Sequence, residues 1–282
     1  MSATLATPGP VVLVTGCSTG GAGFALCQAF EARGCIVYAT SRRLETMQGL
    51  QSERIHLLQM DVSNDDHVAE VVSKIVEEQG RIDILVNNAG TVAGGALIDN
   101  PMDHVKNVFD VNTFSIVRLA KAVVPIMAKQ QSGRIVNIGS VVGDTPTPFN
   151  GLYAASKAAL HSISDVLAME LRPFNIDVML VTPGGIRSNL ANNGALAFKQ
   201  PEDSLYKKYL PAILRRINLS QTTGPWSAED FALDVVAKCL RKRPPAHVMN
   251  GKGWQAFYAL KWLPRTWSLY LFRRIYMKPG SQ

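Results

Sequence analysis

Short apolar runs that alternate with segments of helical spacing are the feature that most constrains this chain. The first run is VVLVT at 11–15, and apolar residues recur at helical spacing in the segment 24–33 that follows it. Runs of the same kind predict strands at 11–15, 36–40, 55–60, 84–87, 134–139 and 177–182. Helical spacing predicts helices at 24–33, 44–50, 65–80, 102–129 and 151–173.

The predicted strands are apolar on both faces, which is typical of a parallel sheet that is covered by helices on both sides. Right-handed crossovers then connect successive strands. We therefore predict an α/β fold with a doubly wound parallel sheet. The sequence shows no repeat of fixed period and no low-complexity linker, so we assign residues 1–282 to a single domain.

Ligands of doubly wound sheets bind beyond the carboxyl ends of the strands, so the segments after the strands are expected to line one site. We assign 11–188 to a cofactor-binding and catalytic core and 189–225 to a helical substrate lid. Residues 244–282 are assigned to a C-terminal extension rich in aromatic and basic residues. The lid range lacks sheet periodicity, and its length suits a mobile segment over a pocket.

The positive charge of the chain is concentrated at its C-terminal end. The formal net charge is +7, yet 241–282 holds nine of the 29 Lys and Arg residues and none of the 22 Asp and Glu residues. No nucleic-acid-binding motif accompanies this charge, so we expect no nucleic-acid partner.

The four cysteines lack metal-ligand spacing, and the first ten residues lack the features of a secretory signal. We expect no metal and a reducing, cytoplasmic compartment.

A glycine-rich segment, TGCSTGGAG at 15–23, stands where the first predicted strand turns into a helix. Small residues at such a turn let the backbone approach a pyrophosphate at the positive end of the helix. A glycine-rich turn without a ligand has the same composition. The contacts expected from this segment are Gly16, Ser18, Gly21 and Ala22.

The second predicted strand is followed by Arg42 and Arg43, and no acidic residue stands where a ribose 2′-hydroxyl would need an acceptor. Two guanidinium groups at this position favour the 2′-phosphate of NADPH or NADP over NADH, although a solvated basic turn is the alternative. Further cofactor contacts are expected after the third and fourth strands, at Asp61, Val62, Asn88, Ala89 and Gly90.

Tyr153 and Lys157 open a predicted helix, where a spacing of four residues places the phenol and the ammonium on the same face. A free tyrosine has a pKa near 10, so acid–base chemistry near neutrality requires a pKa lowered by about three units. Lys157 and a cationic nicotinamide could supply that shift. Ser140 ends the fifth predicted strand, where its hydroxyl could hold a substrate oxygen or cap a turn.

In these motifs the chain resembles the short-chain dehydrogenase/reductase family, whose fold is the Rossmann fold, over roughly residues 11–250. The resemblance is carried, in the family's order, by Thr15-Gly16, the NNAG segment at 87–90, Asn112, Ser140, Tyr153 with Lys157, and Pro183-Gly184. Within the family, the TGCSTGGAG loop, the ATSRRLETM segment and the YAASKAAL helix are most similar to the NADPH-dependent 1-acyldihydroxyacetone-phosphate reductase-like branch.

The resemblance implies a role for each catalytic residue. Tyr153 would be the general acid or base, and Lys157 would bind the nicotinamide ribose and lower the tyrosine pKa. Ser140 would orient the substrate, and Asn112 would hold a proton-relay water.

The resemblance also implies that the segment after the sixth strand meets the nicotinamide, through Pro183, Gly184, Ile186 and Ser188. Ser188 stands where the family more often has threonine, and it keeps the hydroxyl. The glycine loop departs from the family pattern, because four residues rather than three fit between its first two conserved glycines. This leaves open which glycine contacts the phosphate.

We therefore expect an NADPH-dependent oxidoreductase that reduces a ketone, or oxidises the secondary alcohol, of an apolar substrate that is lipid-like or a specialised metabolite. One alternative is a redox-neutral isomerase, cyclase or dehydratase on the same fold. The other is a non-catalytic NADPH-binding protein.

Aromatic and basic residues alternate through 252–278, a composition typical of a surface that lies at a lipid interface. We expect this extension to contact an anionic membrane, such as the endoplasmic reticulum, or a lipid droplet. The alternative is that its aromatic residues pack over the pocket or across a subunit interface. Pro264 argues against one continuous helix in this extension.

The family resemblance also implies that the protein is a homo-oligomer.

Overall fold

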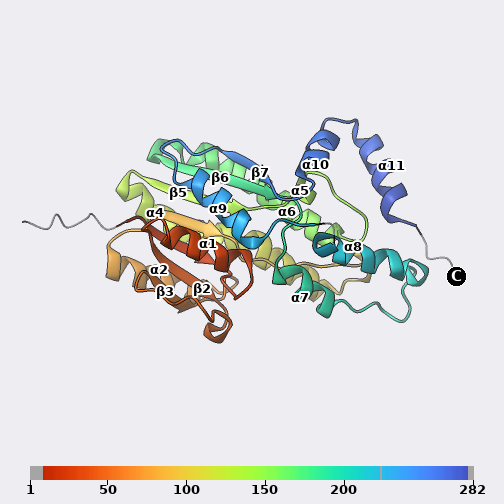
Figure 1. Ribbon diagram of the computed structural model, residues 1–282, viewed down its shortest axis with the longest axis horizontal. Helices are drawn as coiled ribbons and strands as arrows, with labels where there is room; N and C mark the ends of the chain where they lie inside the picture. Colours follow the sequence, from red (N-terminus) through yellow and green to blue (C-terminus); the bar gives the residue numbers. More distant parts are fainter. Residues whose placement is uncertain (1–8, 223, 279–282) are drawn as a thin grey trace, which may run out of the picture.

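In the computed structural model, which describes residues 9–222 and 224–278, the strands of the described chain form one seven-stranded parallel sheet (Figure 1). The predicted lid includes residue 223 and the predicted extension ends with 279–282, which lie outside the described residues. The strand order is β3-β2-β1-β4-β5-β6-β7. The strands are β1 (Val11–Thr15), β2 (Ile36–Ser41), β3 (Ile55–Gln59), β4 (Ile84–Asn87), β5 (Gly133–Ile138), β6 (Ile176–Pro183) and β7 (His247–Asn250).

This order confirms the predicted doubly wound sheet. The chain builds β1, β2 and β3 in one direction and then returns, so that β4 pairs with the other side of β1. The reversal leaves a crevice between the carboxyl ends of β1 and β4, where ligands of such sheets bind.

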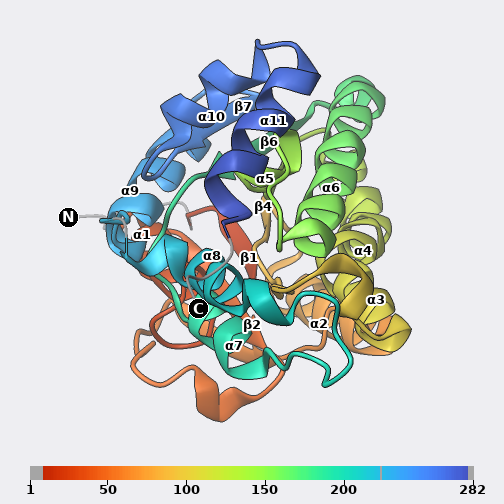
Figure 2. The same ribbon diagram turned by 90° about the vertical axis from the view of Figure 1, so that its right-hand side faces the viewer.

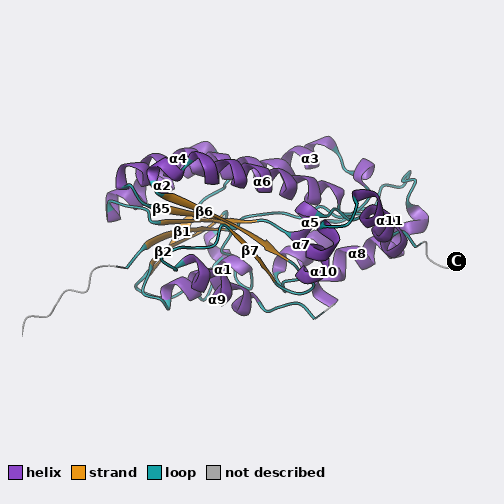
Figure 3. Ribbon diagram, turned by 90° about the horizontal axis from the view of Figure 1, so that it is seen from above, coloured by secondary structure: helices purple, strands orange, loops and turns teal. Residues whose placement is uncertain are grey.

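Helices cover both faces of the sheet (Figure 3). One face carries α2 (Asp65–Gln79), α4 (Ser115–Gln130) and α6 (Gly151–Glu170), and the other carries α1 (Ala22–Glu31) and α9 (Ala228–Cys239).

Alternate residues of β1 enter different cores, which explains why the strand is apolar throughout. Leu13 packs with residues of α2 and α4, whereas Val14 packs with residues of α1 and α9. Both side chains are fully buried. Burial on two faces therefore replaces the alternating polar pattern of a half-exposed strand.

Two predicted helices differ from the observed ones. The helix predicted at 44–50 is only a short 3-10 turn, Leu44–Thr46, because Gly49 has a φ of +92° and the Thr46 hydroxyl bonds to the Arg43 carbonyl. The helix predicted at 102–129 is divided into α3 (Met102–Phe109), a π-helical turn (Asp110–Phe114) and α4. π-Helical turns are frequent at functional sites.

The segment Met102–Gln130 is long and apolar enough to be a candidate membrane span by length and composition. Half of its apolar window is buried, and Leu119, Val123 and Met127 of α4 belong to the core against the sheet. The segment is therefore accounted for as a core helix.

Helix α9 and strand β7 are absent from the prediction. Residues 247–250 were assigned to the extension, but they pair with β6 and complete the sheet. The four residues HVMN carry no apolar run, so their extended conformation depends on the ladder with β6. The core therefore reaches beyond 188.

The remaining helices α7 (Asn189–Ala197), α8 (Leu210–Thr222), α10 (Trp254–Lys261) and α11 (Arg265–Tyr276) gather at the carboxyl end of the sheet (Figures 1 and 2). Pro264 lies between α10 and α11, so the extension forms two helices, as its position in the sequence indicates. The shorter elements are α5 (Val141–Asp144) and the 3-10 turns Leu97–Asp99, Arg172–Phe174 and Lys207–Tyr209.

Candidate active site

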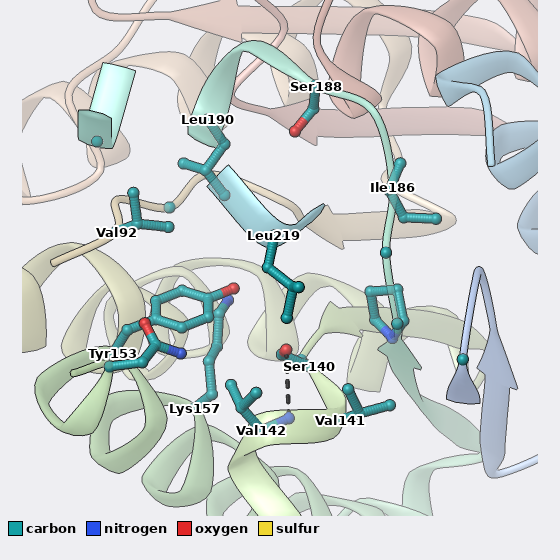
Figure 4. Close-up of a pocket in the computed structure, with 18 of the residues that line it drawn as sticks. Val92, Ser140, Val141, Val142, Tyr153, Lys157, Ile186, Ser188, Leu190 and Leu219 are labelled. Carbon is teal, nitrogen blue, oxygen red and sulfur yellow. Dashed lines mark hydrogen bonds between the residues drawn. The ribbon is translucent and has the colours of Figure 1, made fainter. Parts of the chain in front are cut away.

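A cavity of about 490 Å³ lies beyond the carboxyl ends of β4, β5 and β6 (Figure 4). Ser140, Asn150, Tyr153 and Lys157 are polar lining residues on the side of β5 and α6. Apolar side chains form much of the remaining wall, namely Val92, Val141, Val142, Phe149, Leu190, Ile217, Leu219 and Phe257. The cavity can therefore hold an apolar molecule beside a small group of polar side chains.

Tyr153 and Lys157 extend side by side from the first turns of α6 into the cavity (Figure 4). The Lys157 Nζ lies 5.8 Å from the centroid of the Tyr153 ring. The same Nζ donates a hydrogen bond of 2.7 Å to the carbonyl oxygen of Ile138, the last residue of β5. This bond fixes the buried ammonium relative to the sheet.

Burial moves the pKa values of these two residues in opposite directions. It raises the pKa of Tyr153 to about 12, although a hydrogen bond from Ser140 and the positive charge of Arg216 act against the rise. Burial lowers the pKa of Lys157 to about 8. The predicted lowering of the Tyr153 pKa is therefore not produced by the protein residues, because desolvation of the phenolate outweighs the charges around it.

Ser140 is the N-cap of α5, and its Oγ accepts a hydrogen bond of 3.4 Å from the Val142 backbone N–H. The Ser140 backbone N–H donates to His161 Nε2 at 3.3 Å, so the neutral ring carries its proton on Nδ1, which faces Asp144 Oδ1 at 3.3 Å. Lys261 of α10 lies 3.4 Å from the other oxygen of Asp144. Ser140 thus both caps a turn and lines the cavity, and buried groups hold its backbone.

The Asp144 carboxylate keeps its charge in this partly buried position. Burial acts to raise its pKa, but the hydrogen bond with His161 and the positive charge of Lys261 lower the pKa below the usual value. The segment under Ser140 is therefore held by an anion that contacts both α6 and the C-terminal extension.

Asn112 lies in the π-helical turn between α3 and α4 and is buried. Its amide nitrogen donates to the Thr91 carbonyl at 2.8 Å and to Ser156 Oγ at 3.0 Å, and its amide oxygen accepts from the Thr91 N–H at 2.8 Å. Asn112 therefore joins the loop after β4 to α6. Its implied contact with a proton-relay water stays a prediction.

The loops that follow β1 and β4 pack closely against each other. Gly16 has a φ of +74°, and a Cβ at this position would lie 2.8 Å from Ala89 Cα. Thr15 Oγ1 accepts hydrogen bonds of 3.0 Å from the N–H groups of Asn88 and Ala89. Glycine is therefore required at 16 by both conformation and space.

The N-terminus of α1 is open toward the cavity. The helix begins at Ala22, which lines the cavity, and the capping position is Gly21, which has no side chain to offer. A Cβ at Gly23 would lie 2.3 Å from the Gly16 carbonyl oxygen. These features fit the pyrophosphate of a dinucleotide, which needs close approach to backbone N–H groups at a helix start.

Hydroxyl groups lie together at the carboxyl end of β2. Ser18 Oγ donates to Thr46 Oγ1 at 3.1 Å and lies 3.3 Å from Ser41 Oγ, and Ser41 Oγ lies 2.9 Å from Thr46 Oγ1. Ser18 was predicted as a cofactor contact, whereas Ser41 and Thr46 were not. Both could have been found from their position beside the predicted arginines.

Arg42 and Arg43 are exposed at this same end, but their surroundings differ. Arg43 lies 3.7 Å from Glu45, and both side chains are mostly exposed. The charge of Arg42 reaches Asp61, whose pKa is lowered by Ser63 and Arg42 against the effect of burial. Of the two arginines, Arg43 is therefore the one that is paired with an acidic residue close to it in the sequence. The charge of Arg42 acts instead on Asp61, which follows β3.

The remaining predicted contacts fall into two groups. Val62 is buried in the core, and its carbonyl oxygen accepts a hydrogen bond of 2.8 Å from Arg118. The residues after β6 line the cavity, and Gly184 is held against the extension, because its N–H donates to the Asn250 carbonyl at 2.8 Å. A Cβ on Gly184 would lie 2.2 Å from the Lys252 carbonyl oxygen.

The cavity brings together about half of the predicted residues. Its lining includes Ala22, Asn88, Gly90, Ser140, Tyr153, Lys157, Pro183, Gly184, Ile186 and Ser188. Nine predicted residues are not among its described lining residues, namely Gly16, Ser18, Gly21, Arg42, Arg43, Asp61, Val62, Ala89 and Asn112. Apart from Asn112, which lies in the π-helical turn, the second group surrounds the ends of β1 to β4, where the adenosine half of a dinucleotide is expected.

Among the lining residues that were not predicted, Phe149, Arg216 and Tyr276 come from distant parts of the chain. Phe149 has a positive φ of 61°, which is unusual for a bulky side chain and is often found at functional sites. No local pattern distinguishes Arg216 from its exposed neighbour Arg215.

Comparison with known proteins gives concordant results. The sequence profile described as short chain dehydrogenase matches residues 10–196. The chain is 34% identical over 270 residues to a 3-ketodihydrosphingosine reductase of Bacteroides thetaiotaomicron, covering 94% of this chain and 97% of the relative. It is 36% identical over 211 residues to an NADPH-dependent 1-acyldihydroxyacetone phosphate reductase of Schizosaccharomyces pombe, covering 73% and 71%. A solved serine dehydrogenase complexed with NADP+ superposes with a TM-score of 0.73 at 26% identity, covering 86% and 94%.

Replacing Lys157 with Met is expected to remove a pH dependence of folding stability. Burial lowers the pKa of Lys157 from 10.5 to about 8 in the folded chain. Between these pH values the unfolded chain holds a proton that the folded chain has released, so the stability of the parent rises with pH. Between pH 8 and 10.5, the free energy of unfolding of the parent should rise by up to about 3 kcal/mol more than that of Lys157→Met.

Urea unfolding at several pH values between 7 and 10.5 measures this difference. Lys121→Met, at an exposed position of α4, is the matched control and should follow the parent. Parallel curves for the parent and Lys157→Met would contradict the burial of a titrating ammonium.

Proposed function

The chain belongs to the short-chain dehydrogenase family, and on this basis we propose that it reduces a ketone with NADPH, or oxidises the corresponding secondary alcohol with NADP. The observation that carries the proposal is the meeting of Ser140, Tyr153 and Lys157 in one largely apolar cavity at the carboxyl ends of the strands. An acid, a hydroxyl and a cation at such a place suit proton transfer to a carbonyl oxygen.

Each of the three side chains has a distinct task in the proposed reduction. NADPH, when bound, supplies a hydride to the carbonyl carbon. Tyr153 donates its phenolic proton to the carbonyl oxygen, and its raised pKa keeps the phenol protonated at neutral pH. The Ser140 hydroxyl donates a hydrogen bond to the same oxygen. Lys157, fixed by the Ile138 carbonyl, holds the ribose of the cofactor and places a positive charge behind the phenol.

NADPH rather than NADH is proposed from the residues at the end of β2. The hydroxyl groups of Ser18 and Ser41 lie there, and Arg42 supplies a guanidinium for a 2′-phosphate. Two similar proteins support the proposal by their names, since one is called NADPH-dependent and another was solved with NADP+.

The substrate is proposed to be lipid-like or another apolar metabolite. Valine, leucine, isoleucine and phenylalanine side chains provide most of the cavity wall, and burial of alkyl groups there contributes about 0.8 kcal/mol per CH₂. The names of two relatives refer to reductases of lipid intermediates, which agrees with this wall. In a redox-neutral reaction or a binding function, the acid, the hydroxyl and the cation would not accompany hydride transfer to a carbonyl. The proposed reduction gives each of the three groups a task.

Tyr153→Phe is expected to lower kcat/KM for ketone reduction by about 10²- to 10⁴-fold, because it removes the proton donor and little volume. NADPH oxidation with a panel of apolar ketones measures the rate. Tyr258→Phe, at an exposed position of α10, should behave as the parent. A parent that converts a substrate without consuming NADPH would favour the redox-neutral alternative, and unchanged turnover in Tyr153→Phe would refute the mechanism.

Arg42→Ala is expected to weaken NADPH binding by about 10- to 100-fold and to leave NADH binding unchanged, since it removes a charge-assisted contact to the 2′-phosphate. Arg43→Ala should have a smaller effect, because Arg43 lies beside Glu45. Fluorescence titration with both cofactors tests the assignment. Equal or tighter binding of NADH by the parent would overturn it.

The C-terminal extension has two faces, and each agrees with one interpretation of its sequence. Phe257 stacks on Phe272, which stacks on Tyr276, and Phe257 and Tyr276 line the cavity. The outer face leaves Trp262 and Trp267 75% and 67% exposed. Packing over the pocket therefore accounts for Phe257, Phe272 and Tyr276, but not for Trp262 and Trp267.

We also propose that the outer face lies on an anionic lipid surface at the cytoplasmic side of the endoplasmic reticulum or on a lipid droplet. The argument is charge complementarity, because this exposed apolar surface carries Arg265, Arg273, Arg274 and Lys278 and no acidic residue. Each basic residue near such a surface contributes about 1 kcal/mol.

Substitution of Trp262 and Trp267 together by Ala is expected to reduce binding to phosphatidylserine-containing vesicles at least several-fold, because their burial in the interface is lost. Co-sedimentation at low and high salt measures binding, and Leu205→Ala, at another exposed apolar position, is the control. If the parent binds anionic and neutral vesicles equally poorly, the membrane proposal is wrong.

The homo-oligomer implied by the family resemblance remains a proposal. Helices α4 and α6 are neighbours on one face of the sheet (Figure 2). Their exposed apolar residues include Val117, Val166 and Met169. Sedimentation velocity of the purified chain would test it.

A further inference from the structure

The cavity is positively charged. Its described lining residues include Lys157, Arg216 and Lys252, and none of them is Asp or Glu. Cations that line a concave site with apolar walls raise the local concentration of anions. Lys157 is assigned to the proposed reaction, and Lys252 is exposed, so Arg216 is the cation inside the cavity that has no assigned task.

Arg216 is held in a fixed orientation by groups from two distant segments. Its Nε donates a hydrogen bond of 2.9 Å to the hydroxyl of buried Thr147. Its guanidinium carbon lies 5.6 Å from the centroid of the Tyr276 ring, a distance that suits a cation–π contact. The Nε bond and the aromatic face leave the two terminal nitrogens for a further partner.

No carboxylate in the described part of the chain forms an ion pair with Arg216. Burial lowers the pKa of its guanidinium, and the groups that act in the other direction are Tyr276 and Tyr153. A partly buried cation without a counter-ion costs stability unless a ligand supplies the negative charge. The cost is therefore explained if the site is built to receive an anion.

The position of Arg216 distinguishes this anion from the cofactor phosphates. Thr147 and Tyr276 belong neither to the glycine loop nor to the end of β2, where the phosphates of NADPH are expected. The charge of Arg216 acts on the Tyr153 phenol instead. Its target is accordingly a group on the substrate, close to the carbonyl that Tyr153 protonates.

We propose that Arg216 selects substrates that carry an oxyanion, a phosphate monoester or a carboxylate, near the ketone, and that it binds this group through its terminal nitrogens. The proposal rests on the proposed ketone reduction and adds the class of substrate to it. The substrate is then an amphiphile whose apolar part contacts the valine and leucine wall and whose anion contacts Arg216. A planar guanidinium matches the geometry of either oxyanion.

Paired ketones test the proposal by kinetics. The pairs are 2-oxododecyl phosphate with 1-hydroxydodecan-2-one, and 3-oxododecanoate with its methyl ester, so that each pair differs in the anion and the two pairs separate phosphate from carboxylate. For at least one pair, Arg216→Met should lower kcat/KM for the anionic member by about 10- to 100-fold and change the neutral member little. Arg216→Lys should retain part of the preference, and Arg215→Met, its exposed neighbour on α8, should retain all of it.

Two results would overturn the proposal. One is an anionic-to-neutral ratio of kcat/KM that is the same in the parent and in Arg216→Met for both pairs. The other is an equal rise in the KM for NADPH with every ketone, which would assign Arg216 to the cofactor.

A binding experiment keeps the proposal testable if the parent reduces none of the four ketones, a result that would count against the proposed reaction only. Calorimetric titration of the full chain with NADP and octyl phosphate or octanoate, with 1-octanol as the neutral partner, measures the anion contact without turnover. Tighter binding of an anion by the parent, lost in Arg216→Met and kept in Arg215→Met, supports the inference. Equal binding of octyl phosphate, octanoate and 1-octanol by the parent contradicts it.

Discussion

Parallel pairing of β1, β4, β5 and β6 in one register is the constraint on which the site depends. It brings the residues that follow four separate strands to one edge of the sheet, with Asn87 opposite Asn137 and Ile138 opposite Val181. The carbonyl of Ile138 at that edge accepts the hydrogen bond of Lys157, and the loops after β1 and β4 interlock there. A shift of one residue would reverse every side chain between the two faces and separate these groups.

Desolvation is the second constraint, and it acts on the two central residues in opposite ways. The ammonium of Lys157 and the phenol of Tyr153 both lose water in the cavity wall, so the neutral form of each gains. A protonated phenol is the form that reduction of a carbonyl requires. The same loss of water strengthens every charge in the cavity, which makes a single arginine able to discriminate between ligands.

The C-terminal extension is joined to the active site as well as exposed to solvent. Lys261 of α10 reaches the carboxylate of Asp144, which faces His161 below the backbone of Ser140. Tyr276 of α11 stacks on Arg216 from the lid. Contact of the outer aromatic face with a lipid surface would therefore act on the same two helices that close the cavity over an amphiphilic substrate.

The sequence by itself determined the doubly wound sheet, the glycine loop, and the placing of Tyr153 and Lys157 on one helical face. These features follow from local chemistry, because apolar β-branched runs, glycine conformations and four-residue spacing act over a few neighbouring residues. Tertiary structure alone decided what depends on distant partners. It added β7 through pairing with β6, gave Arg216 its place between Thr147 and Tyr276, and raised rather than lowered the pKa of Tyr153. Burial and charge at one point are sums over segments far apart in the chain, and no local pattern records them.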